Sequence, residues 1–221
     1  MLGLAEEKSL VQSADYSLLE MEREHSETFQ DSWLMSEYLL VVNPDKPVYN
    51  KVVEVKQEFD KQYNEKKAMR TLPSISIAAF MAREPMENTF IRWIQRICGQ
   101  QESFQVTLNN FSGFPPHSIY LRVQDPFPFQ QLVRQLQSVD DFIRSGGCPP
   151  AKFFVRPYLS IAAKLPEQVY ESAIPDYSRL SFHESFIADE LVLLKRQQEF
   201  DSYQILFVFR FFPKDRKSLQ S

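Results

Sequence analysis

The sequence has few of the residues on which several common kinds of functional site depend. Its two cysteines, Cys98 and Cys148, exclude a disulfide framework and a four-cysteine zinc site. We expect both to be free thiols in a reducing compartment, which predicts a cytoplasmic protein. Its three histidines, His25, His117 and His183, are scattered and lack the spacing of zinc ligands. The sequence therefore predicts no bound metal.

Glycine is also scarce, and long apolar runs are missing. The five glycines form neither a phosphate-binding loop nor a Gly-x-Ser-x-Gly turn, so we expect no cofactor. No apolar run approaches the ~20 residues that a membrane helix needs, and no membrane partner is expected. The first residues include Glu6 and Glu7 and no basic segment, which argues against a signal peptide. Nineteen phenylalanines predict a large packed core. We also expect the protein to be a monomer.

The net charge of −4 is unevenly distributed along the chain. Residues 1–36 carry eight acidic and two basic side chains, whereas the remainder carries 21 acidic and 23 basic ones. A nearly neutral body does not have the charge of a tight, nonspecific nucleic-acid binder. It remains compatible with a small phosphorylated ligand or a short RNA end.

A short pattern occurs twice. Pro73-Ser74-Ile75-Ser76-Ile77-Ala78-Ala79 returns 84 residues later as Pro157-Tyr158-Leu159-Ser160-Ile161-Ala162-Ala163. Two copies of such a pattern suggest a duplicated structural unit. Each copy alternates polar and apolar residues, as a half-buried strand does, so its two polar side chains share one face. If the two units are related by pseudo-symmetry, these four side chains are expected to face each other across one groove.

The hydrophobic patterns predict alternating strands and helices. The predicted strands cover 38–42, 72–80, 104–108, 119–123, 157–163, 181–188, 190–194 and 203–211, and the predicted helices cover 46–66, 85–99, 129–143 and 166–174. This order, with mostly antiparallel pairing, predicts the α+β class. The chain is expected to divide into an acidic extension (1–36), one domain (37–212) and a flexible tail (213–221). The extension is either a docked helix around Tyr16–Glu24 or disordered, and Met35 is an alternative start.

With these elements in place, the repeated motif resembles the 2′-5′ RNA ligase/cyclic phosphodiesterase-like family of the two-histidine phosphoesterase superfamily. Members carry two His-x-[Ser/Thr] motifs on equivalent strands. The segments 38–44, 117–121 and 186–196 are also similar to a bacterial branch of the family, so the resemblance spans roughly residues 37–211. It implies a bilobal, pseudo-symmetric fold with two mostly antiparallel sheets, helices on the outside and a central groove.

The resemblance implies a metal-free reaction in which one histidine takes a proton and the other gives one, while Ser/Thr hydroxyls hold phosphate oxygens. Here Ser74 and Tyr158 stand at the two histidine positions. Histidine has a pKa of about 6.5, which suits proton transfer, whereas tyrosine, at about 10, suits it poorly. The family's catalysis therefore does not carry over, and the enzyme status is left uncertain, leaning towards a pseudoenzyme. Ser76 and Ser160 match the phosphate-holding positions.

The leading hypothesis is a noncatalytic protein that binds a phosphorylated nucleotide or RNA end through Ser74, Ser76, Tyr158 and Ser160. Arg156, two residues before Tyr158, can share their face and supply charge. The alternative for these residues is a wet strand face without a ligand, with Arg156 in a surface ion pair. His117 is expected to serve a turn. Two other functions stay open, namely an active phosphodiesterase on 2′,3′-cyclic or 2′-5′ phosphodiesters with Tyr158 as acid, and a protein-interaction module that uses the acidic extension.

Overall fold

The computed structural model describes residues 35–66, 71–198 and 200–213. The chain divides into two units, Met1–Met35 and Ser36–Ser221, and the fold is that of the second unit. The predictions for Tyr16–Glu24, for His25 and for tail residues 214–221 lie outside the described residues. Met35 is the first residue of the first strand, and its use as a start stays a prediction.

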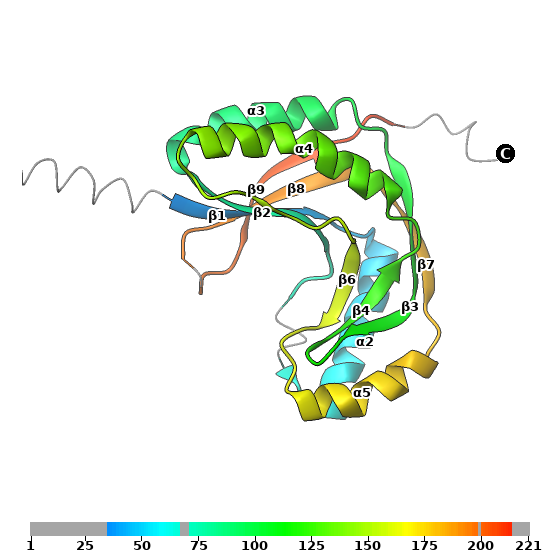
Figure 1. Cartoon of the computed structure of the whole chain (residues 1–221). Helices are drawn as coiled ribbons and strands as arrows, with labels where there is room; N and C mark the ends of the chain where they lie inside the picture. Colours follow the sequence, from blue (N-terminus) through cyan, green and yellow to red (C-terminus); the bar gives the residue numbers. More distant parts are fainter. Residues whose placement is uncertain (1–34, 67–70, 199, 214–221) are drawn as a thin grey trace, which may run out of the picture. The chain divides into compact units, whose positions relative to one another are not determined.

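Strands and helices alternate along the chain as the sequence predicts (Figure 1). Their bounds are β1 Met35–Val42, α2 Lys46–Tyr63, β2 Ile75–Arg83, the short 3-10 helix η2 Glu84–Met86, α3 Glu87–Cys98, β3 Phe104–Phe114, β4 Ser118–Val123, α4 Phe127–Ser145, β5 Lys152–Phe153, β6 Tyr158–Ala162, α5 Glu167–Arg179, β7 His183–Ala188, β8 Glu190–Arg196 and β9 Gln204–Arg210. None of the described helices is long and apolar enough to cross a membrane.

Most predicted elements are confirmed within a few residues, and three differ. The strand predicted over 104–108 continues as β3 to Phe114, which still pairs with β4. The pattern predicts that the last helix ends before Pro175, but α5 continues to Arg179. Proline costs this helix one backbone hydrogen bond. The extra turn buries Tyr177, whose ring centroid lies 5.3 Å from that of Phe59. The sequence does not predict strand β5, because a strand of two residues is too short to show an alternating pattern.

The strands form one sheet in the order β7-β3-β4-β6-β2-β1-β8-β9, and β5 also pairs with β2. We call β7, β3, β4 and β6 the β4 half, and β2, β1, β8 and β9 the β1 half. The two halves meet where β6 pairs with β2, through the single residue pair Ile75↔Leu159. The α+β class is confirmed, and the two predicted sheets are the two halves of one curved sheet (Figure 1).

Two helices cross from one half to the other. Helix α2 follows β1 but packs on β6 and β7, whereas α4 follows β4 but packs on β2 and beside α3. Consequently α3 and α4 cover the β1 half, and α2 and α5 cover the β4 half (Figure 1). Each crossing helix lies on the half that its own preceding strand does not belong to.

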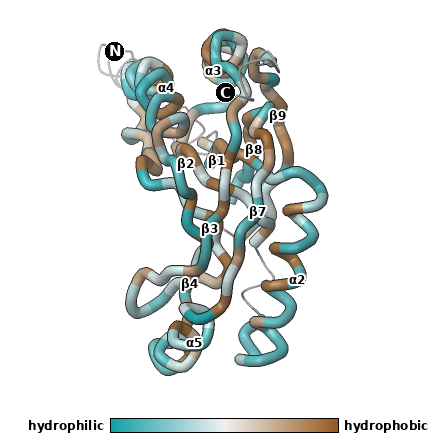
Figure 2. Tube along the Cα trace, turned by 90° about the vertical axis from the view of Figure 1, so that its right-hand side faces the viewer, coloured by the Kyte–Doolittle hydropathy of each residue, from teal (hydrophilic) through white to brown (hydrophobic). Residues whose placement is uncertain are grey.

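The crossing helices are amphipathic. In α2, hydrophobic segments recur between hydrophilic ones (Figure 2). The buried residues of α2 are Val48, Val52, Lys56 and Phe59, and those of α4 are Phe129, Leu132, Val133, Leu136, Val139 and Ile143. A stripe of this kind, repeated every three to four residues, packs on a sheet. The first turn of α2 is capped by Asp45, whose carboxylate accepts a hydrogen bond of 3.1 Å from the Val48 N–H.

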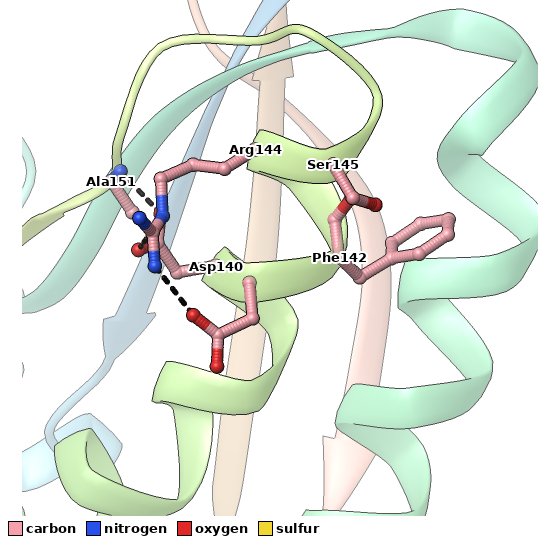
Figure 3. A network of polar contacts seen from close by, with 6 residues as sticks. Asp140, Phe142, Arg144, Ser145 and Ala151 are labelled. Atoms are coloured by element: carbon pink, nitrogen blue, oxygen red, sulfur yellow. Dashed lines mark hydrogen bonds and ion pairs between the residues drawn. The ribbon is translucent and has the colours of Figure 1, made fainter.

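Side chains of both crossing helices also hold the connections that lead to the repeated motifs. The Lys56 ammonium of α2 donates to the carbonyl and the hydroxyl of Thr71, at 3.0 and 2.9 Å. In α4, the Asp140 carboxylate accepts a 2.6 Å hydrogen bond from the Ala151 N–H and pairs with Arg144 at 3.0 Å (Figure 3). Each motif strand is therefore tied to a crossing helix shortly before it begins.

Candidate functional site

The two copies of the repeated motif lie on neighbouring strands. Ser76 lies in β2, Tyr158 and Ser160 lie in β6, and Ser74 immediately precedes β2. All four side chains are partly exposed. We refer to them as the hydroxyl cluster.

The hydroxyl cluster surrounds the pair Ile75↔Leu159, which joins the two halves of the sheet. Both apolar side chains are fully buried on the face that the helices cover. Because successive strand residues point to opposite faces, the four hydroxyls lie together on the other face, which we call the open face. Side chains in such directly opposite or diagonal positions lie roughly 4.5–8 Å apart. The motifs therefore lie side by side on adjoining strands of the curved sheet, at the junction of its two halves. That the four side chains line a groove stays a prediction.

The hydroxyls differ in their hydrogen bonds. The Ser74 hydroxyl donates to the Leu72 carbonyl at 3.4 Å. Within the part of the chain that the structure describes, the hydroxyls of Ser76, Tyr158 and Ser160 make no hydrogen bond to other protein groups. Since a hydroxyl both donates and accepts, these three groups can bind the oxygens of an anionic ligand.

Strand β4 brings two further side chains to the cluster. Tyr120 pairs with Ser160 in the ladder, and Arg122 pairs with Tyr158, so both lie on the open face. Arg122 is exposed, and its Nε donates to the Asn109 carbonyl at 3.2 Å. In the ladder Arg122 therefore adjoins the cluster through Tyr158, while its guanidinium bonds to β3 on the other side of β4. A guanidinium can bind phosphate, and such a contact by Arg122 stays a proposal. The alternation of residues 119–123 places both side chains on one face, but the sequence does not reveal that β4 pairs with β6.

Three aromatic rings extend the open face beside the hydroxyls. Phe114 stacks on Tyr120 with ring centroids 4.3 Å apart and an angle of 22° between the rings. Tyr158 lies 5.2 Å from Phe114 and 5.1 Å from Tyr120. Phe114 is 42% exposed although its ring contacts two other aromatic rings. We call Phe114, Tyr120 and Tyr158 the aromatic wall.

His117 fixes the turn that carries Phe114, as the sequence predicts. Its backbone N–H donates to the Phe114 carbonyl at 3.0 Å, and its carbonyl accepts from the Leu165 N–H at 2.9 Å. Its ring Nδ1 donates to the Leu165 carbonyl at 3.1 Å. The β3–β4 turn is therefore fastened to the segment between β6 and α5.

Arg156 lies in a bend between β5 and β6 and is exposed. The prediction that it shares a face with Tyr158 assumes a continuous strand through both residues. The ladder passes from Ile75↔Leu159 to Ala78↔Phe153, so five residues bulge opposite two of β2. Strand alternation does not extend through such a bulge, and a ligand contact by Arg156 stays a prediction.

The remaining candidates lie elsewhere. His183 is an exposed residue that opens β7. A surface pocket of about 490 Å³ lies beside the β8–β9 turn, and another of about 480 Å³ lies beside α3 and α4; neither is lined by the hydroxyl cluster. Among the described residues, no group of three or more His, Cys, Asp or Glu side chains could hold a metal ion.

Comparison with known proteins identifies the family and the fold. The sequence model described as the 2′-5′ RNA ligase superfamily matches residues 44–199. The crystal structure of E. coli LigT complexed with 3′-AMP is similar, with 15% identity, a TM-score of 0.57, and coverage of 80% of this chain and 98% of LigT. A Thermus thermophilus protein has 15% identity, a TM-score of 0.56 and coverage of 79% and 97%. The sequence matches no curated protein significantly.

Proposed function

The chain belongs to the 2′-5′ RNA ligase superfamily, and we propose that it binds the phosphate of a nucleotide or an RNA end without catalysing its turnover. One observation carries the proposal. On the open face, four hydroxyl side chains from two distant segments gather around the point where Ile75 and Leu159 pair. The structures of E. coli LigT with 3′-AMP and with ATP support a nucleotide as the ligand.

The chemistry of the cluster suits phosphate recognition. Ser76 and Ser160 donate hydroxyl hydrogen bonds to phosphate oxygens, and Arg122 adds a charge-assisted bond from the neighbouring strand. The phosphate lies on the open face across the junction of the two halves. Its oxygens replace water around hydroxyls that have no other protein partner among the described residues.

The absence of turnover follows from the side chains at the two motif positions. A general acid or base contributes about 10²–10⁴-fold to a rate and works best with a pKa near the operating pH. Ser74 has no neighbouring base in its motif, and its hydroxyl donates to the Leu72 carbonyl. The Tyr158 hydroxyl has no hydrogen-bonded base beside it among the described residues, so nothing there prepares it to take over the proton transfer of a histidine.

Calorimetric titration with 3′-AMP, 2′,3′-cyclic AMP and a short RNA tests the proposal. We expect saturable binding to wild type and at least tenfold weaker binding to Ser76→Ala/Ser160→Ala, because charged ligands bind such hydroxyls strongly. The matched control, Ser138→Ala/Ser178→Ala, removes two exposed helix hydroxyls and is expected to bind as wild type does. If wild type binds none of the three probes, the proposal is wrong.

A catalytic alternative is favoured by one observation, the pairing of Tyr158 with Arg122 in the β4–β6 ladder, which places both residues on the open face. In this alternative Tyr158 gives a proton to the leaving oxygen of a 2′,3′-cyclic or 2′-5′ phosphodiester. It requires that wild type hydrolyses such a substrate and that Tyr158→Phe abolishes the rate. A rate that persists in Tyr158→Phe excludes Tyr158 as the acid.

A further inference from the structure

The aromatic wall adjoins the hydroxyl cluster and shares a residue with it. Tyr158 belongs to both, and Tyr120 lies directly opposite Ser160 in the β4–β6 ladder. Phe114 comes next, one face of its ring stacked on Tyr120 and much of the side chain exposed. The path from the serine hydroxyls to the Phe114 ring therefore crosses about two neighbouring side chains, each step about 5 Å.

We propose that the aromatic wall stacks the base of a nucleotide whose phosphate lies at the hydroxyl cluster. The proposal rests on the proposed function and narrows its ligand to one with a planar ring joined to phosphate through a single ribose. The exposed ring of Phe114 receives the base, and Arg122 lies on the phosphate side of the wall. Stacking tolerates every base because each has a π-face, so the site selects nucleotides over sugar phosphates.

The β1 half does not offer a comparable surface. Among the described residues, its open face presents the ion pair between Glu37 and Arg196 and apolar side chains. Leu39 lies opposite Leu194, and Leu194 lies opposite Ile205. Tyr203 is already engaged, because the Arg196 guanidinium lies 4.7 Å from its ring centroid and Glu37 accepts its hydroxyl at 2.7 Å. The base therefore lies over the β4 half.

The wall is held in place before any ligand binds. His117 ties the turn after Phe114 to the segment before α5. On the other side of Phe114, Gly113 lets α5 approach, since a Cβ at Gly113 would lie 2.4 Å from the Tyr170 hydroxyl oxygen. A stacking surface that is already ordered loses little conformational freedom on binding.

The test compares two probes that share a phosphorylated ribose and differ in the base, AMP and ribose 5-phosphate. For Phe114→Leu we expect about tenfold weaker AMP binding, the usual order for loss of one stacked ring. Ribose 5-phosphate affinity is expected to stay unchanged. The control Phe127→Leu removes a similarly exposed phenylalanine, 53% exposed at the start of α4, and is expected to change neither affinity. In NMR spectra, the adenine H2 and H8 signals should shift upfield on binding to wild type, and less on binding to Phe114→Leu.

The outcomes separate this inference from the phosphate site. If AMP and ribose 5-phosphate bind wild type equally well and Phe114→Leu binds both normally, the wall is not a base site, although the phosphate site stands. If Ser76→Ala/Ser160→Ala binds AMP as wild type does while Phe114→Leu does not, the base site stands and the phosphate assignment is wrong. If wild type binds neither probe, both are overturned.

Discussion

The two halves of the sheet follow one structural plan and present different chemistry on the open face. Each half has four strands, and each is covered by two helices, one of which crosses from the other half. The β4 half presents Arg122, Tyr120 and Phe114, whereas the β1 half presents apolar side chains and the Glu37–Arg196 ion pair. The difference teaches that the duplicated plan positions the motifs, while residues outside the motifs distinguish the two halves and underlie our proposal that the ligand lies over the β4 half.

The crossing helices differ in the same way beneath the sheet. Both tie down the chain before a motif, but α2 uses the buried Lys56 and α4 uses the partly exposed Asp140. All residues that α4 buries are apolar, whereas α2 buries an ammonium group with them. Burying a charge is costly unless it is hydrogen-bonded, so the two anchors have different energetic consequences.

Placing histidines at the two motif positions should have the largest effect. The double variant Ser74→His/Tyr158→His makes the motifs of both halves alike, and we expect it to hydrolyse 2′,3′-cyclic AMP at least about 10²-fold faster than wild type, because it carries two side chains suited to proton transfer. Product release is measured by chromatography. Each single variant serves as a control and should stay close to wild type. A double variant that binds 3′-AMP but gains no activity would show that the open face lacks more than its histidines.

The second largest difference is expected in the free energy of unfolding, between a substitution at the junction of the halves and one at the edge of the β1 half. Ile75→Ala removes a fully buried side chain where the halves meet, and we expect it to lower the free energy of unfolding by about 2–5 kcal/mol. Ile205→Ala removes a side chain that is 67% exposed in β9, and its effect should stay within about 0.5 kcal/mol. Urea denaturation measures both values. Equal losses would contradict the role of Ile75 as the joint between the halves.

The buried ammonium of α2 should make stability depend on pH. Burial lowers the pKa of Lys56 to about 8 from an ordinary 10.5. Between these values the unfolded chain binds more protons than the folded one, so stability rises with pH, by at most about 1.4 kcal/mol per pH unit. Below pH 8 both states are protonated and this contribution is constant.

Denaturation at pH 8 and pH 9.5 tests the effect, and Lys56→Met serves as the variant without the ammonium. We expect wild type to be more stable at pH 9.5 by about 1–2 kcal/mol relative to the change seen in Lys56→Met. The comparison with the variant removes the opposite effect of the tyrosines Tyr63 and Tyr177, whose pKa values burial raises. If wild type and variant change in parallel, Lys56 remains charged in the folded protein.

The smallest predicted effect compares one arginine from each half. Arg122→Gln should weaken 3′-AMP binding about tenfold, since a charge-assisted bond to phosphate is lost. Arg196→Gln should leave the affinity within about twofold, because Arg196 is paired with Glu37 in the other half. Calorimetric titration in the same buffer measures both. The assignment of the ligand to the β4 half fails if Arg196→Gln is the more damaging change.

Much of the fold follows from local patterns in the sequence. The period of two in each motif places Ser76 and Ser160 on the face opposite buried residues, and the helical period of α4 predicts its buried stripe. The place of His117 just before a strand predicts a role in a turn, and its hydrogen bonds confirm that role. These features depend on neighbours close in the chain, so one sequence suffices to predict them.

Other parts of the site depend on pairings that no local pattern specifies. Tyr120 and Arg122 lie beside the hydroxyl cluster only because β4 pairs with β6, which 34 intervening residues separate. The bulge before β6 interrupts the alternation on which the Arg156 prediction relied. Lys56 belongs to a helix rich in charged side chains, so its sequence suggests exposure. Its burial follows from the crossing of α2 onto the other half.

That crossing also bears on how such a chain can arise by duplication. A polypeptide with only one unit would carry a helix with no sheet of its own beneath it, and its apolar stripe would be left in water. Two copies that exchanged this helix would each cover the other, as in a domain-swapped dimer with two-fold symmetry. The present chain corresponds to that dimer joined into one polypeptide. Each half of its sheet is thus shielded from solvent partly by a helix that follows a strand of the other half.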